Sequence, residues 1–271
     1  MTKMPLYLRK NTSDQSVVKV GPVRIGGPKI AVIAGPCSVE SEAQLLLCAE
    51  FLKKSGIKIM RASAFKPRTS PYSFQGLGEE GLKLLSKVGH QTGLAVETEV
   101  MDVRDVAVAA KYVDVLRVGA RNMQNYDLLE EMGKQKKPVI LKNGLAATMD
   151  EFLNAAEYIL KEGNPNVILC LRGIRTFETK TRFSFDPGLI PALKHETHLP
   201  VIVDPSHPAG KREFVPAIAR AAIAAGADGL LIEVHPNPVL ALSDNDQQLD
   251  FPEFEKLLGE LKRVTIAVGR Q

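Results

Sequence analysis

Two short apolar runs near the C-terminus are each followed at once by residues that can bind a metal ion or move a proton. Asp204 and His207 follow Val201–Val203, and Glu233 follows Leu230–Ile232. Short, wholly apolar runs are typical of buried parallel strands, and functional side chains gather where such strands end. We therefore expect the histidine and Glu233 to converge at the carboxyl ends of two strands.

Two further residues complete a candidate metal site. Asp244 lies one loop after Glu233, and Cys37 follows the apolar run Lys29–Ala34. A thiolate, an imidazole and two carboxylates suit a divalent transition ion such as Mn²⁺, Fe²⁺, Co²⁺ or Zn²⁺. A cysteine of a cytosolic protein is commonly just a small buried hydrophobe, and Asp244 lies in the turn-like sequence SDND. The spacing alone leaves the metal site and these simpler interpretations open.

Six cations near the other predicted strand ends indicate that the protein binds anions. They are Arg61, Lys66, Arg68, Arg121, Lys142 and Arg172. Arginine binds phosphate or carboxylate through two parallel hydrogen bonds, and lysine supplies a point charge. Six such groups exceed the needs of one phosphate monoester, so we expect a substrate with both phosphate and carboxylate, or two anionic substrates. Pairing of these cations with carboxylates of the protein is disfavoured, because few acidic residues lie near them in the sequence.

Eight strand–helix units could position these residues. The predicted strands end at or just before Cys37, Arg61, Glu97, Arg117, Lys142, Arg172, Asp204 and Glu233. Units repeated about every 30 residues predict a (β/α)8 TIM barrel, in which all the carboxyl ends of the strands open on one face. An open, doubly wound sheet is the alternative. We expect residues 29–271 to form one barrel domain, and residues 1–28 to form an arm and a short β-hairpin. The helix before the last strand should bury the stripe Phe214, Ile218, Ala221, Ala222 and Ala225.

The composition is that of an ordinary globular protein and excludes several classes of function. A formal net charge of +4 is too small for a nucleic-acid coat protein. No apolar run reaches the roughly 18 residues that cross a bilayer, and the N-terminus lacks the apolar core of a signal peptide. Three widely spaced cysteines make no disulfide framework, and Cys48 and Cys170 are expected in the core. We therefore expect a cytoplasmic protein that binds neither nucleic acid nor membrane.

Several motifs, taken together, resemble those of a known enzyme family. The segments GPCSVES, FKPRTSPYSFQGLG, GARNMQN, LKNG, LRGIRTF, VDPSHPAGK, IEVHPNP and ALSD are similar to 3-deoxy-D-arabino-heptulosonate 7-phosphate (DAHP) synthase. The similarity is to the short form, without a regulatory domain, that is related to 3-deoxy-D-manno-octulosonate 8-phosphate synthase. It implies metal-dependent condensation of phosphoenolpyruvate with erythrose 4-phosphate and water, the first step of the shikimate pathway. It also implies a homodimer or homotetramer.

The matched motifs also imply roles for individual residues. By this resemblance, the divalent metal is held by Cys37, His207, Glu233 and Asp244. Phosphoenolpyruvate is bound by Arg61, Lys66, Ala120, Arg121, Lys142 and Arg172. The aldose phosphate is bound by Arg68 and Thr69 of the KPRT segment, which favours the four-carbon sugar. We expect Lys66 to act as the general acid, with Cys37 and His207 as the other catalytic residues.

Three other functions remain open at this point. One is the sister reaction with arabinose 5-phosphate, which gives the octulosonate product. Another is a Schiff-base aldolase with Lys142 as the nucleophile, because neighbouring cations can activate a lysine. The third is a barrel that binds phosphosugars without turnover, which has no need for Cys37 and Asp244 together.

Overall fold

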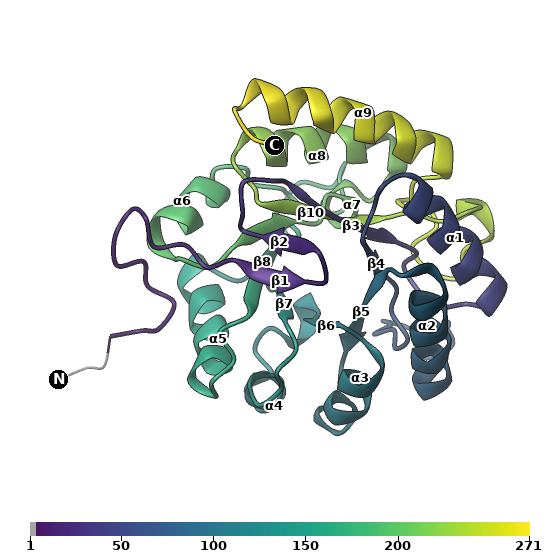
Figure 1. Cartoon of the computed structure of the whole chain (residues 1–271), viewed down its shortest axis with the longest axis horizontal. Helices are drawn as coiled ribbons and strands as arrows, with labels where there is room; N and C mark the ends of the chain where they lie inside the picture. Colours follow the sequence, from purple (N-terminus) through teal and green to yellow (C-terminus); the bar gives the residue numbers. More distant parts are fainter. Residues whose placement is uncertain (1–3) are drawn as a thin grey trace.

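The structure is a computed structural model that describes residues 4–271, and a closed barrel of eight parallel strands forms its centre (Figure 1). The strands are β3 (Ala31–Gly35), β4 (Ile59–Arg61), β5 (Ala95–Val100), β6 (Val115–Val118), β7 (Val139–Lys142), β8 (Val167–Leu171), β9 (Val201–Val203) and β10 (Gly229–Glu233). They follow one another around the barrel in chain order, and β10 closes it by pairing with β3. The (β/α)8 prediction is confirmed, and the open sheet is excluded.

Helices connect the strands and cover the outside of the barrel (Figure 1). They are α1 (Glu42–Lys54), α2 (Gly78–Thr92), α3 (Val106–Tyr112), α4 (Tyr126–Gly133), α5 (Met149–Lys161), α6 (Leu189–Glu196), α7 (Ser206–Ala209), α8 (Val215–Ala224) and α9 (Phe251–Ala267), with short 3-10 turns η1 (Val103–Asp105), η2 (Ala120–Asn122), η3 (Arg212–Phe214) and η4 (Pro238–Leu240). Hydrogen bonds from capping side chains define where several helices begin. The side chain of Ser41 accepts a hydrogen bond from the backbone of Gln44 at the start of α1, and capping boxes begin α5 and α9.

An antiparallel hairpin closes the amino-terminal end of the barrel. Its strands are β1 (Val18–Val20) and β2 (Val23–Ile25), and Figure 1 shows the pair lying across the ring of strands. Val18, Val20 and Ile25 are almost fully buried, in one apolar cluster with the inward-facing residues of the strands. Burial of apolar surface holds the hairpin in place. Since this end is filled, functional chemistry is left to the opposite mouth. The predicted hairpin is thus confirmed.

The buried face of α8 differs from the predicted stripe. The helix buries Val215, Ala219, Ala222 and Ile223, so Ala222 of the predicted stripe is buried, whereas Phe214, the first residue of that stripe, is 36% exposed. The helix consists almost entirely of alanine and aliphatic residues, so several stripes had nearly equal apolar character and the sequence did not distinguish them. None of the helices in residues 4–271 has both the length and the apolar composition that a membrane crossing needs.

Candidate active site

A cavity of about 480 Å³ opens at the carboxyl ends of the strands and carries a strong positive charge. Eight cations and only two carboxylates, Glu99 and Asp244, line it. The cations are Lys66, Arg68, Arg117, Arg121, Lys142, Arg172, Arg175 and Arg182. Such a cleft, walled by a barrel of low dielectric constant, attracts and concentrates anions. The cavity is therefore suited to small polyanionic ligands.

A thiol and two carboxylates meet beside this cavity. Ligand atoms of Cys37, Glu233 and Asp244 all lie within 4.8 Å of one another, the one such cluster of potential metal ligands in residues 4–271. Cys37 follows β3, Glu233 ends β10, and Asp244 follows η4. The pairing of β3 with β10 brings these segments together. Asp244 has a φ of 47°, a left-handed conformation that costs energy outside glycine and is typical of functional positions.

The charges in the cluster are balanced by a proton and by neighbouring cations. The Sγ–H of Cys37 donates to Asp244 Oδ2 at 3.1 Å, and Lys66 Nζ lies 2.9 Å from the same sulfur. Burial, followed by the negative charges of Asp244 and Glu233, raises the pKa of the Cys37 thiol. Burial alone would also raise the pKa of Asp244, but Lys66, His207 and Arg182 hold that pKa well below its ordinary value. A cation bound here would replace the thiol proton.

His207 lies at the edge of the cluster, on the short helix α7. Its Nε2 is 3.9 Å from Glu233 Oε1, while its Nδ1 is 2.6 Å from Asp204 Oδ2. Burial lowers the pKa of His207 against the opposing effect of Asp204, which favours the neutral ring that metal ions bind. A carboxylate behind one ring nitrogen leaves the other free toward the site. The donor set of one sulfur, one nitrogen and two carboxylates fits a divalent transition ion.

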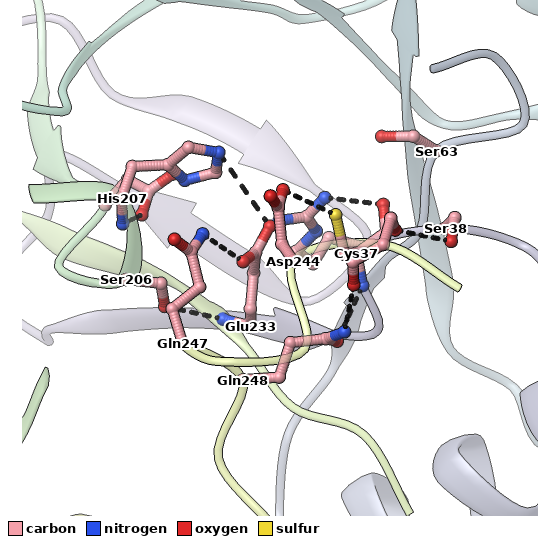
Figure 2. Close-up of polar contacts among 12 residues, drawn as sticks. Cys37, Ser38, Ser63, Ser206, His207, Glu233, Asp244, Gln247 and Gln248 are labelled. Carbon is pink, nitrogen blue, oxygen red and sulfur yellow. Dashed lines mark hydrogen bonds and ion pairs between the residues drawn. The ribbon is translucent and has the colours of Figure 1, made fainter. Parts of the chain in front are cut away.

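Three strand-end cations are paired with buried carboxylates, contrary to the expectation that acidic partners would be few. Arg61 NH1 lies 2.8 Å from Glu233 Oε1, and Lys142 Nζ lies 2.5 Å from Asp204 Oδ2. Arg117 donates to Glu97 at 2.7 Å and to Glu99 at 3.0 Å. Sequence distance concealed these pairs, because barrel closure and strand register create them. Figure 2 shows Glu233 at the centre of the contacts that join the cluster.

Arg61 and Arg172 differ in the way their charge is compensated. Arg61 is fully buried, donates to Glu233 and to the carbonyl oxygen of Cys37, and does not line the cavity. Arg172 lines the cavity and stacks on Phe183, with 3.7 Å from its guanidinium carbon to the ring centroid. Within residues 4–271, Nε and NH1 of Arg172 have no hydrogen-bond partner. A buried guanidinium with free N–H groups is ready to bind an anion.

The remaining predicted substrate residues lie around the mouth of the cavity. Lys66, Arg68 and Thr69 belong to the loop after β4, and Ala120 and Arg121 belong to η2. Lys66 is only 5% exposed, whereas Thr69 and Arg121 are exposed. All five line the same cavity as Lys142 and Arg172. The structure thus brings together every predicted substrate residue except Arg61, which lies behind the cluster.

Several residues of the site were missed in the sequence. Glu99 could have been found, because it lies two residues after Glu97 and alternate strand residues share a face. The others were given no role in the sequence, because only the folded barrel brings them to the site. They are Ser63, Arg175, Arg182, Phe183, Gln247 and Gln248.

Known proteins resemble this chain over almost its whole length. The model of the DAHP synthetase I family matches residues 10–269. Phospho-2-dehydro-3-deoxyheptonate aldolase of Thermotoga maritima is 48% identical over 264 residues, which cover 97% of this chain and 78% of that protein. A crystal structure of the same Thermotoga maritima aldolase, also called DAHP synthase, superposes with a TM-score of 0.95 at 47% identity, covering 98% of this chain and 78% of the other.

A sister group of enzymes is also similar, at lower identity. The 2-dehydro-3-deoxyphosphooctonate aldolase of Acidithiobacillus ferrooxidans (strain ATCC 53993 / BNL-5-31) is 34% identical over 258 residues, which cover 89% of this chain and 91% of that protein. The greater identity lies with the heptonate aldolase. The resemblance predicted from the motifs is confirmed, and the chain is an enzyme of the DAHP synthetase I family.

Proposed function

We propose that this protein condenses phosphoenolpyruvate with erythrose 4-phosphate and water, to give DAHP and phosphate. The observation that carries the proposal is the cavity lined by eight cations and two carboxylates, next to a cluster of metal-binding type. Two substrates that bring two phosphates and a carboxylate match such an excess of positive charge. The 48% identity to a phospho-2-dehydro-3-deoxyheptonate aldolase supports the same choice.

The two substrates are assigned to different parts of the cavity. We assign phosphoenolpyruvate to the inner part, with Arg172, Lys142 and Arg121, because Arg172 has free N–H groups there. We assign the phosphate of the aldose to Arg68 and Thr69 on the outer loop. Tight placement of both substrates lowers the entropic part of the barrier, which is the main contribution expected from these residues. Arg61 would act indirectly, by holding Glu233.

Cys37, His207, Glu233 and Asp244 would hold a divalent metal ion. Cys37 and Glu233 are fully buried, His207 and Asp244 are partly buried, and the pKa of His207 is lowered, all of which supports this set. Such an ion supplies Lewis-acid polarisation and a fixed point for orienting the aldehyde or the attacking water. Mn²⁺, Fe²⁺, Co²⁺ and Zn²⁺ all suit mixed sulfur, nitrogen and oxygen ligands. Asp204 behind the ring would keep Nε2 of His207 directed at the site.

Lys66 is the candidate general acid. In the reaction, C3 of phosphoenolpyruvate bonds to the aldehyde carbon, whose oxygen gains a proton, and water adds at C2 before phosphate leaves. Burial lowers the pKa of Lys66, but Cys37 and Asp244 raise it beyond this, so the net shift is upward. The ammonium therefore keeps its proton at neutral pH and can give it to the more basic alkoxide as that forms. Its place on the cavity wall allows contact with both substrates.

The alternative functions predict different assay results. The Schiff-base route is disfavoured because Nζ of Lys142 is engaged by Asp204 at 2.5 Å, and borohydride should trap no adduct. The octulosonate reaction is tested by offering arabinose 5-phosphate beside erythrose 4-phosphate. The decisive experiment is phosphate release from phosphoenolpyruvate with erythrose 4-phosphate, before and after chelation. Full release after chelation would refute the metal site, and release only with arabinose 5-phosphate would refute the substrate.

The setting of the enzyme follows from the same proposal. Cys37, Cys48 and Cys170 are all buried free thiols, which supports a reducing compartment such as the cytoplasm. We propose that residues 29–271 form the catalytic domain, with residues 1–28 as its arm and hairpin, of which residues 1–3 lie outside the described part of the chain. A homodimer or homotetramer is the expected assembly. Light scattering of the purified protein would measure it.

A further inference from the structure

Two adjacent glutamines, Gln247 and Gln248, reach the thiol–carboxylate cluster from outside it. Both side chains are buried, at 1% and 0% exposure, and neither lines the cavity. They follow Asp244 in the chain, and Figure 2 shows their amides directed at two different residues of the cluster. Buried amides that contact no substrate space need a role within the protein.

Gln247 connects the two carboxylates. Its Nε2 donates to Glu233 Oε2 at 2.6 Å, and its Oε1 accepts from Arg182 NH1 at 2.7 Å. The same Arg182 nitrogen donates to Asp244 Oδ1 at 3.2 Å. Because Gln247 fixes one oxygen of Glu233, the other oxygen remains on the side of Arg61 and His207. One neutral amide thus sets the orientation of Glu233 and, through Arg182, that of Asp244.

Gln248 holds the thiol-bearing residue. The backbone N–H of Cys37 donates to Gln248 Oε1 at 2.9 Å, across 211 positions of sequence. Nε2 of Gln248 donates to the carbonyl oxygen of Ser243 at 2.8 Å, directly before Asp244 with its left-handed backbone. The one side chain therefore joins the segment of Cys37 to the segment of Asp244 and helps to hold the strained conformation.

We propose that Gln247 and Gln248 are positioning residues for a metal ion held by Cys37, Glu233 and Asp244, an inference that rests on the metal site of the proposed function. A glutamine offers a donor and an acceptor without charge, so it can orient a carboxylate or a backbone segment without changing the charge that the ion meets. Loss of an outer hydrogen-bonding partner of a metal ligand typically weakens metal binding about 10- to 100-fold.

The test measures Co²⁺ binding to the full chain, after removal of bound metal, by competition with a coloured chelator. Gln247→Met and Gln248→Met keep the side-chain length and remove both hydrogen-bonding atoms. Each should raise the Co²⁺ dissociation constant about 10- to 100-fold. Gln248→Met should also shift the sulfur-to-cobalt absorption band, because its partner is Cys37. Gln15→Met is the matched control, since Gln15 donates to Gly26 at 2.7 Å near the hairpin, and its affinity should stay at the wild-type value.

The outcomes separate this inference from the proposed metal site. Thermal unfolding identifies the folded variants, and if a methionine variant does not fold, the shorter amides of Gln247→Asn and Gln248→Asn carry the same expectation. Folded variants with affinity and spectrum like those of the wild type would overturn the inference alone, provided that Cys37→Ala abolishes Co²⁺ binding. A wild-type protein that binds no Co²⁺, or a Cys37→Ala variant that binds it normally, would overturn the metal site and the inference together.

Discussion

Replacement of Arg172 by methionine should make the protein more stable and less active. In the free protein this guanidinium is buried at 4% exposure, stacks on Phe183, and has two N–H groups without a partner in residues 4–271. An uncompensated buried charge destabilises the fold, while the same charge binds the substrate. Stability and affinity should therefore change in opposite directions.

The magnitude follows from the electrostatics. Burial, opposed by Asp204 and aided by Arg182 and Arg121, lowers the pKa of Arg172 from 12.5 to about 10. One pKa unit corresponds to about 1.4 kcal/mol, so burying the charged form of Arg172 costs about 3 kcal/mol of folding free energy. At pH 7 the group is charged in both the folded and unfolded states, so this cost is fully present. Methionine also loses the stacking on Phe183, about 1–2 kcal/mol. The net gain of about 1–2 kcal/mol should raise Tm by about 2–6 °C.

The same Arg172→Met replacement should strongly reduce the activity. Each charge-assisted hydrogen bond to an anion contributes about 1.5–3 kcal/mol, so loss of two should lower kcat/KM for phosphoenolpyruvate by at least about 100-fold. Thermal unfolding with and without phosphoenolpyruvate is the assay, and the ligand should stabilise only the wild type. Arg104→Met is the control, because Arg104 is exposed and pairs with Asp102 on the surface. A lower Tm together with unchanged kcat/KM would refute the reasoning.

Three further predictions concern other parts of the site. Cys37→Ala should abolish metal-dependent phosphate release with the fold retained, and full activity in this variant would contradict the metal assignment. Arg68→Ala should raise KM for the aldose phosphate by about 10-fold or more and leave KM for phosphoenolpyruvate nearly unchanged. Steady-state kinetics with each substrate varied in turn would test this, and a higher KM for phosphoenolpyruvate alone would contradict it. Burial raises the pKa of Glu99, but Arg117 and Lys66 lower it further, so the net shift is downward. The ionised carboxylate therefore stabilises the fold above pH ~4.5 and loses that contribution as pH falls through the lowered pKa. Glu99→Gln should reduce stability by about 3 kcal/mol at pH 7, and urea unfolding should show that the difference shrinks in acid; a difference independent of pH would contradict this.

The barrel could be predicted because its signal repeats. Each apolar strand is followed by a polar strand end and then by a helix, and eight repetitions leave few other folds. The same rule predicted that Cys37, His207, Glu233 and Asp244 would meet at one mouth; Cys37, Glu233 and Asp244 form the cluster, and His207 lies at its edge. The face of α8 could not be predicted, because its alanines and aliphatic residues give no unique stripe. Phe214 lies outside the buried face for that reason.

The pairing of charges could not be read from the chain. Arg117 contacts Glu99 because the register of β5 and β6 places the two residues side by side, and register depends on barrel closure. Lys142 contacts Asp204 across 62 positions of sequence. Arg61 was expected at the substrate, but the same closure places it against Glu233. The residue types indicated that these charged groups belong to the functional site. Whether each one forms an ion pair or faces the substrate cavity became clear only from their positions in the folded barrel.

The position of the cluster at the junction of β3 and β10 affects when it can form during synthesis. Cys37 is synthesised 207 residues before Asp244. A nascent chain therefore carries an exposed, incomplete ligand set until its final strand inserts beside the first. A metal ion bound at this junction would favour the closed barrel over chains in which β10 is not paired with β3.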